Sequence, residues 1–271
     1  MKTIIAPTDF SKGSLNAVSY AAELAVMLQA RLLIVNIIAL PVSITEITFT
    51  EATIAEMEES DEREFSKLKD KLTAQTNGKI DIKVVSEVGT VEYELEDICS
   101  REKPFAIVMS SSNSTALERF LEGSNTLSLV HHVSYPVLVI PQEYSFKKIQ
   151  KIAFACDLEK SLLTHTFSVV KELVSLFNAE LHIVNITTKE LSGADNIINS
   201  IHVQNKLNQL KPVFHFISDK KVAHGISAFI EQNKPDLLVV IPQQHGLFHK
   251  SQSKPFLLHT GIPVLAVSEI S

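Results

Sequence analysis

Histidine is the most unevenly placed residue type in this chain, and it offers the first candidate chemistry. Eight of the ten histidines lie in the second half, where His245 and His249 stand four residues apart. On a helix, that spacing places two imidazoles on one face, as a divalent metal requires. A third ligand would come from His224 or Asp157, each of which follows an apolar segment. The alternative is a set of scattered surface and boundary histidines that share no ligand.

Other catalytic patterns are missing from the sequence. It contains no G-x-S-x-G, no H-E-x-x-H and no intact phosphate-binding P-loop, so nothing pairs a nucleophile with a base. Cys156 precedes Asp157, and we expect it to be a small buried hydrophobe, not a reactive thiol. We therefore assign no catalytic residue and no metal ligand. A metal-assisted hydrolase that uses the second-half histidines stays an alternative.

Composition excludes several classes of protein. Apolar residues make up 45% and charged residues 21% of the 271 residues, which is typical of a globular chain and not of a disordered one. Two cysteines give no disulfide framework. The formal charge of −6 argues against nucleic acid as a partner. The longest apolar run, Leu32–Val42, is too short to cross a membrane. We expect a cytoplasmic protein with no membrane partner.

The chain contains two copies of one unit. An apolar strand pattern ends at Asp9 and recurs 148 residues later, ending at Asp157, with a helical pattern after each. Three later landmarks recur in the same order, pairing residues 31–37 with 180–186, 103–109 with 234–241, and 135–141 with 262–268. Four landmarks in one order indicate a tandem repeat, and the falling offset makes the second copy shorter.

Each copy is predicted to alternate strands with helices. In the first copy we expect helices at residues 14–29 and 51–72, and strands at Thr3–Ala6, Leu32–Ile38, Ile80–Ser86, Phe105–Ser110 and Val137–Ile140. Apolar strands that alternate with helices indicate a parallel sheet covered on both faces. The predicted fold class is α/β, with two tandem, doubly wound domains of five parallel strands at residues 1–145 and 146–271. Such sheets bind ligands beyond the carboxyl ends of the strands, where the strand order reverses.

The ordered set of segments resembles the universal stress protein family in a tandem form. The matching pieces are PTDFS at residues 7–11, IVNI at 34–37, VGTVEYELEDI at 88–98, the dipeptide Gly123–Ser124, and YPVLVIP at 135–141. The resemblance covers nearly the whole chain. It implies a flavodoxin-like or adenine-nucleotide-hydrolase-like fold in each domain, and a stress-response or signalling role.

The resemblance also implies a nucleotide site in the first domain. Nucleotide-binding members carry a loop written G-x2-G-x9-G-[ST] after the fourth strand, in which backbone N–H groups cradle the phosphates. The spacing and the final Gly123–Ser124 are kept here, while Ser110 and Asn113 replace the first two glycines. Asparagine tolerates a positive φ, whereas the Cβ of Ser110 stands where a phosphate would approach.

By the same resemblance, ATP or AMP would bind in the first domain, with Mg²⁺ only alongside the nucleotide. The adenine-side residues would be Pro7, Asp9, Ile37 and Met109, and the phosphate-side residues would be Ser110, Asn113, Gly123, Ser124 and Asn125. Two alternatives stay open. In the first alternative, Ile37 and Met109 are ordinary core residues at the strand ends. In the second, Asp9 caps the first helix.

The second domain has no such loop. Pro242 stands where Ser110 does, and proline has no N–H to offer a phosphate. The pair Gly123–Ser124 becomes Lys250–Ser251. We therefore expect a nucleotide in the first domain only.

Two apolar strands offer a means of pairing the halves. Val137–Ile140 and Val264–Val267 carry no charge, and an exposed edge of that kind invites pairing. The resemblance implies that such strands pair domains, so we expect an intrachain pseudo-dimer. A homodimer and protein partners of unknown identity are further expectations. The leading hypothesis is a tandem universal stress protein with weak adenine-nucleotide binding, and the alternative is a protein-interaction module that binds no nucleotide.

Overall fold

The computed structural model describes residues 1–38, 51–111, 135–156, 164–187, 203–241 and 260–267. Contacts between Cα atoms divide the chain into two compact units, Met1–Thr126 and Leu127–Ser271. The boundary between residues 145 and 146, which follows the sequence repeat, stays a prediction.

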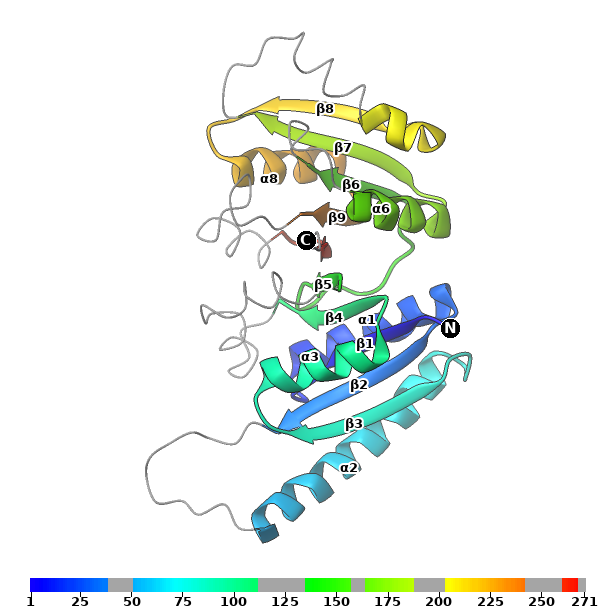
Figure 1. The fold of residues 1–271 in the computed structure, drawn as a ribbon, viewed down its shortest axis with the longest axis vertical. Coiled ribbons are helices and arrows are strands. Elements are labelled where there is room, and N and C mark those ends of the chain that lie inside the picture. The colour runs from blue at the N-terminus through cyan, green and yellow to red at the C-terminus, as the bar shows by residue number, and fades with distance from the viewer. Residues whose placement is uncertain (39–50, 112–134, 157–163, 188–202, 242–259, 268–271) are drawn as a thin grey trace. The chain divides into compact units, whose positions relative to one another are not determined.

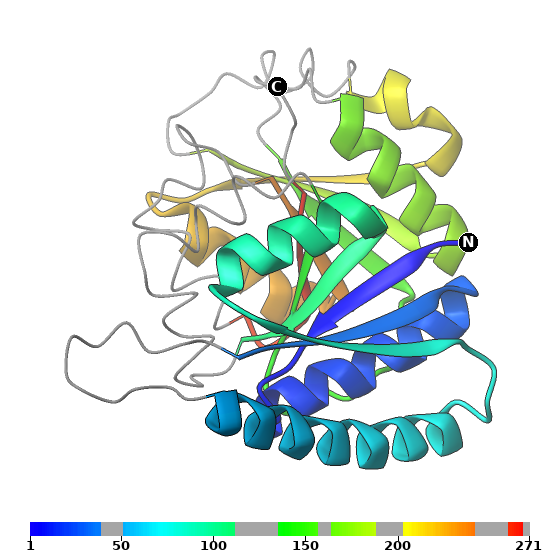
Figure 2. The ribbon, with the colours of Figure 1, turned by 60° about the horizontal axis from the view of Figure 1, so that its bottom comes forward.

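The first unit is a parallel α/β unit (Figure 1). Its elements are β1 (Thr3–Pro7), α1 (Lys12–Leu28), β2 (Arg31–Ile38), α2 (Glu51–Gln75), β3 (Ile82–Val88), α3 (Val91–Glu102) and β4 (Ala106–Ser110). Its strands lie in the order β3-β2-β1-β4 and pair in parallel. The chain moves outward from β1 to β3 and then returns to β4. Because such crossovers are right-handed, α1 and α2 cover one face and α3 the other, as Figure 2 shows.

Hydrophobic burial explains both the strands and the helices of this unit. All five residues of β1 and all five of β4 are buried, as continuous apolar strands between two helical layers must be. The two predicted helices and the first four predicted strands are present, with ends that differ by up to three residues; β3 begins at Ile82 and not at Ile80. The fifth predicted strand, Val137–Ile140, lies in the second unit and pairs antiparallel, not parallel. The turn after α2 takes up the residues before β3. The N–H of Gly78, whose φ is 64°, donates to the carbonyl of Thr73, and the N–H of Lys79 donates to the carbonyl of Thr76.

The second unit repeats this plan and adds one antiparallel strand (Figure 1). Its elements are β5 (Val137–Ile140), β6 (Lys151–Ala155), α6 (Thr164–Phe177), β7 (Glu180–Thr187), η2 (Asn208–Leu210), β8 (Val213–Ser218), α8 (Val222–Asn233), β9 (Leu237–Val240) and β10 (Val264–Ala266). The strand order is β5-β10-β9-β6-β7-β8. Residues 203–207 are helical, within the segment 192–210 that corresponds to α2.

Register shows which helix covers which face of β6 and β7. Ala153 pairs with His182, and Phe154 pairs with Ile183. Successive side chains point to opposite faces of a sheet. His182 contacts Phe229 of α8, whereas Phe154 contacts Phe167 of α6 at 6.0 Å between ring centroids. α6 and α8 therefore lie on opposite faces, as α1 and α3 do in the first unit.

The two closing strands of the repeat form an antiparallel ladder inside the second unit. Val139 pairs with Val264, Leu138 with Leu265, and Val137 with Ala266. All residues of both strands are buried. The role of this ladder in joining the two repeats stays a prediction.

The two repeats end their third helices in the same way. Lys103 after α3 and Lys234 after α8 are left-handed C-caps, with φ of 44° and 47°. Each is followed by a proline, which cannot continue the helix. This equivalence sets the offset between the repeats at 131 residues here. Among the described residues, no helix is long and apolar enough to span a bilayer.

Candidate functional site

Three hydroxyl groups hold the turn that follows β1. Thr8 Oγ1 lies 3.0 Å from Ser14 Oγ, and Ser11 Oγ donates to Ser14 Oγ at 3.2 Å. The backbone N–H of Ser14 donates to Ser11 Oγ at 3.3 Å, so Ser11 is the N-cap of α1. Asp9 is therefore not the cap, which rules out the capping alternative. Its Oδ1 accepts the backbone N–H of Ser11 at 3.1 Å, which closes a turn and fixes the carboxylate at the end of β1.

Phe10 has a strained backbone conformation in this turn. Its φ is 58°, in the left-handed region, where a bulky side chain costs on the order of 1–3 kcal/mol. Its ring packs edge-to-face on Phe65 of α2, with centroids 5.2 Å apart. Phe65 is buried, and an aromatic pair of this kind offsets about 1 kcal/mol beyond burial. The strained turn is thus held by packing against the second helix.

The carboxyl ends of β1, β2 and β4 bring the predicted adenine-side residues to one edge. Pro7 pairs with Val35 in β2, and Ile37 lies two residues beyond. Ile5 pairs with Ile107 in β4, and the same parallel offset places Pro7 level with Met109. The strand order reverses here, because β2 and β4 flank β1 on opposite sides. This is the position at which open parallel sheets bind ligands.

Burial differs among these residues. Met109 is 2% exposed and Ser110 is 1% exposed, while Ile37 and Asp9 are half-buried. The hydroxyl of Ser110 thus lies inside the fold; its match to the first glycine of a nucleotide-binding loop stays a prediction. The remaining phosphate-side residues, Asn113, Gly123, Ser124 and Asn125, lie outside the described residues.

A polar cluster that the sequence did not reveal fixes the end of β2. Asn36 Nδ2 donates to Asp61 Oδ2, and Ser86 Oγ donates to the same oxygen at 2.9 Å. Asn36 pairs with Ser86 across β2 and β3, so one carboxylate of α2 bridges both strands. The only signal in the sequence was Asn36, a polar residue inside an apolar strand. Its separation from Asp61 along the chain follows no periodic pattern, so the sequence does not predict their contact.

The same edge of the second unit is built differently. Cys156 stands in the place of Thr8 and is 6% exposed, as expected for a small buried residue. Its carbonyl accepts Asn185 Nδ2 at 3.1 Å, and Asn185 is the counterpart of Asn36. Asp157 and Pro242 lie outside the described residues.

The histidines of the second unit fall into different settings. His224, at the start of α8, is bonded through Nδ1 to Asp219 Oδ2, and this bond lowers the pKa of Asp219. His245 and His249 lie outside the described residues. Within the described ranges, no three His, Cys, Asp or Glu side chains gather as a metal site would require. The sequence missed a second pair, His182 and His215, which form a hydrogen bond on β7 and β8.

Comparisons with known proteins identify a family by its sequence model and find solved structures with a similar fold. A family model described as the universal stress protein family matches residues 1–141. A universal stress protein from Archaeoglobus fulgidus DSM 4304 superposes with a TM-score of 0.75 at 18% identity, covering 98% of this chain and 96% of that one. A functionally unknown protein from Pseudomonas aeruginosa PAO1 superposes with a TM-score of 0.63 at 11% identity, and the match covers 99% of this chain and 93% of that one. The cytoplasmic domain of a prokaryotic cation chloride cotransporter superposes with a TM-score of 0.52 at 8% identity, and the match covers 98% of this chain and 94% of that one. No curated protein matches in sequence.

Proposed function

Because the chain belongs to the universal stress protein family, we propose that its first unit binds an adenine nucleotide, ATP or AMP, in a stress-response or signalling role. The observation that carries this proposal is the reversal of strand order at β1. Asp9 and Ile37 lie there at the ends of neighbouring strands, half-buried.

The chemistry of these residues suits the adenosine part of a nucleotide. The Asp9 carboxylate accepts hydrogen bonds, and a ribose hydroxyl or the adenine amino group supplies donors. Its position is fixed by the bond to Ser11 and by the packed turn at Phe10. Ile37 is half-buried and gives apolar surface that suits the flat face of a base, while Met109 is 2% exposed and forms part of the core at the same edge.

The phosphate side sets the strength of binding. Asn113, Gly123, Ser124 and Asn125 would hold the phosphates through backbone N–H groups, with Mg²⁺ as their counterion. Ser110 opposes this, since its Cβ stands where the family has glycine. We therefore expect weak binding in the first unit and none in the second, where proline follows Ile241.

Calorimetric titration of the full chain with ATP and with AMP, with and without Mg²⁺, tests this proposal. Asp9→Asn keeps the Oδ1 acceptor of the turn but removes the charge, and should weaken binding about tenfold. Ser110→Gly should tighten binding, because it restores the glycine. Ser111→Gly, a change at the neighbouring buried serine, is the matched control and should leave affinity unchanged. If neither Asp9→Asn nor Ser110→Gly changed the affinity, the nucleotide would bind elsewhere.

The second candidate function is a protein-interaction module that binds no nucleotide. The observation that favours it is the buried Ser110 side chain at the end of β4. If millimolar ATP gives no heat with either the wild-type chain or Ser110→Gly, this second function replaces the first. A metal-assisted hydrolase would need ligands beyond His224, whose Nδ1 is already engaged by Asp219.

The β5–β10 ladder supports a further part of the proposal, that the two repeats pair within one chain. The support is an antiparallel register centred on Leu138 and Leu265, with every residue of both strands buried. Closure of both apolar edges by one ladder removes surface that would otherwise recruit another chain. A homodimer or a complex with another protein would be detected as a larger mass of the particle in solution.

A further inference from the structure

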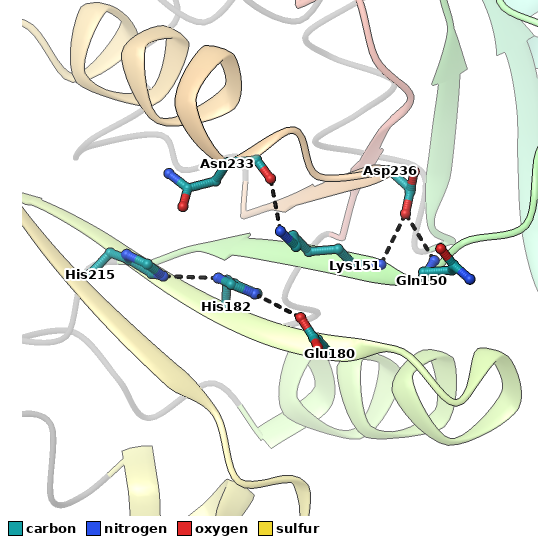
Figure 3. A network of polar contacts seen from close by, with 7 residues as sticks. All are labelled: Gln150, Lys151, Glu180, His182, His215, Asn233 and Asp236. Carbon is teal, nitrogen blue, oxygen red and sulfur yellow. Dashed lines mark hydrogen bonds and ion pairs between the residues drawn. The ribbon is translucent and has the colours of Figure 1, made fainter.

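Two histidines on neighbouring strands of the second unit share one hydrogen bond. His182 Nδ1 on β7 lies 2.9 Å from His215 Nε2 on β8 (Figure 3). The ring planes differ by 13° and the centroids are 5.1 Å apart. At that separation two nearly parallel rings lie edge to edge and not face to face, so the contact is an in-plane N–H···N bond.

The position of Glu180 selects which ring donates the proton. Glu180 Oε2 lies 3.6 Å from His182 Nε2 (Figure 3), a buried nitrogen with no hydrogen-bond partner of its own. A carboxylate disfavours a lone pair beside it, so Nε2 of His182 carries the proton. Nδ1 of His182 is then the acceptor, and Nε2 of His215 is the donor. The neutral pair thus forms a directed chain from Glu180 through His182 to His215.

This arrangement accepts one extra proton but not two. The first proton enters at Nδ1 of His215, and the bond between the rings then gains a charged donor. The second proton has to enter at Nδ1 of His182, which is occupied as the acceptor. Two imidazoliums would present N–H groups to each other at 2.9 Å. The second protonation therefore breaks the bond.

The surroundings strongly disfavour that doubly charged state. His182 is 7% exposed, and the ring of Phe229 from α8 packs edge-on against His215 at 4.8 Å. The charged groups that act on the pair are Glu180 on β7 and Lys151 on β6, whose Nζ donates to the carbonyl of Asn233 at 2.9 Å. Burial lowers the pKa of His182 and of His215, and Lys151 adds to both effects.

The fold itself does not require this pair. With the repeat offset of 149 residues, His182 corresponds to Leu33 and Val184 to Val35. Val184 pairs with His215 and Val35 pairs with Val85, so the strand register makes Val85 the counterpart of His215. With the offset of 131 residues at the third helix, Phe229 corresponds to Ile98. The first unit therefore fills the same positions with aliphatic side chains. A hydrogen-bonded histidine pair at a position that an apolar pair can fill gives the second unit a property that the first lacks.

We propose that the His182–His215 pair is an acid-responsive latch that holds β8 against β7 and α8 and releases it when both imidazoles are protonated. β8 is the last strand in the sheet order of its unit, and Val213 and Phe216 on it are 49% and 43% exposed. Release exposes further apolar surface of β7 and α8, and this surface would be open to a binding partner only at acidic pH.

The sign of the pH dependence follows from linkage. Both folded-state pKa values lie below the ordinary value of 6.5, so the unfolded or opened form binds protons first as the pH falls. Stability from the latch is complete above about pH 6.5 and is lost as the pH falls toward the folded-state values. The opening equilibrium rises at most about tenfold per pH unit for each proton taken up.

Hydrogen exchange of the full chain between pH 8 and pH 5, corrected for the intrinsic exchange rate, tests the latch. Protection of the β8 amides should fall as the pH drops below 6.5, by up to about tenfold per pH unit for each proton taken up. Protection of the β3 amides, the matched edge of the first unit, should change little. His182→Leu with His215→Val, the residues of the first repeat, should remove the pH dependence of β8. A parallel fall in wild type and double variant would overturn the proposal.

A second measurement does not depend on the double variant folding. Long-range nitrogen–proton NMR spectra of the wild-type chain report the tautomer of each histidine. The latch requires that His182 carries its proton on Nε2 at neutral pH and that the two rings titrate as a coupled pair. Independent titration of both rings near 6.5 would overturn the proposal as well.

Discussion

Replacement of Asp61 by alanine should loosen the end of β2, where the proposed nucleotide site begins. Asp61 Oδ2 accepts hydrogen bonds from Asn36 Nδ2 and Ser86 Oγ. After truncation the exposed Ser86 hydroxyl bonds to water at little cost. The amide of Asn36 is 9% exposed and keeps a stranded donor. A buried donor left without a partner costs about 1–3 kcal/mol, so we expect a loss of about 2 kcal/mol.

Thermal and urea unfolding followed by circular dichroism measure this loss. For a unit of this size, about 2 kcal/mol corresponds to a fall in Tm of about 8 °C in the transition that contains the first unit. Glu62→Ala, at an exposed neighbour on α2, is the matched control and should stay within about 0.5 kcal/mol of wild type.

A double-mutant cycle separates the bond from the general effect of truncation. Asn36→Ala combined with Asp61→Ala should cost clearly less than the sum of the two single changes, with a coupling of about 1–2 kcal/mol. Additive single changes, or an Asp61→Ala variant as stable as Glu62→Ala, would refute the bridging role of this carboxylate.

Three further expectations concern other parts of the chain. Gly225→Ala should destabilise the second unit by about 1 kcal/mol in urea unfolding, because overpacking outweighs helix propensity: the new Cβ would lie 3.0 Å from Ile186 Cδ1. A smaller side chain, Ile186→Val, should relieve part of that cost. Burial raises the pKa of Cys99 to about 12, so at pH 8 iodoacetamide should label it in urea but not in the native chain; rapid native labelling would contradict the burial. Leu138→Lys with Val139→Lys should expand the chain in small-angle scattering, and an unchanged radius would count against pairing through β5.

Local patterns predicted much of the fold. Hydrophobic periodicity predicted the strand and helix positions, while the tandem repeat, inferred from four landmarks in one order, stays a prediction. The end of α3 follows from Lys103 and the proline after it, which recur at Lys234. The start of β3 was placed two residues early, since the turn at Gly78 takes up Lys79 through hydrogen bonds that periodicity does not report.

The candidate site was less predictable, for a physical reason. The family resemblance named Pro7, Asp9 and Met109 as site residues, and the strand register places Pro7 and Met109 at one edge of the sheet. The capping alternative named Asp9, whereas the hydrogen bond from the Ser14 N–H to Ser11 Oγ identifies Ser11 as the cap. Contacts between residues far apart in sequence leave no periodic signal.

The histidine pair illustrates the same limit. His182 and His215 are 33 residues apart and lie on separate strands, and their contact depends on the register of β7 against β8. The sequence alone indicates two histidines among apolar neighbours. Alignment of the two repeats carries more information, because it sets each histidine against an aliphatic residue of the first unit.

Native mass spectrometry of the freshly purified full chain, before and after addition of ATP and Mg²⁺, is the most direct test of nucleotide binding. We predict that the mass of the chain increases by that of one nucleotide. Gly123→Val should abolish this bound form, and Ser110→Gly should increase its fraction. A single increment would agree with a site in the first unit only. No increment at millimolar ATP, in wild type and in Ser110→Gly alike, would contradict the account and direct attention to protein partners.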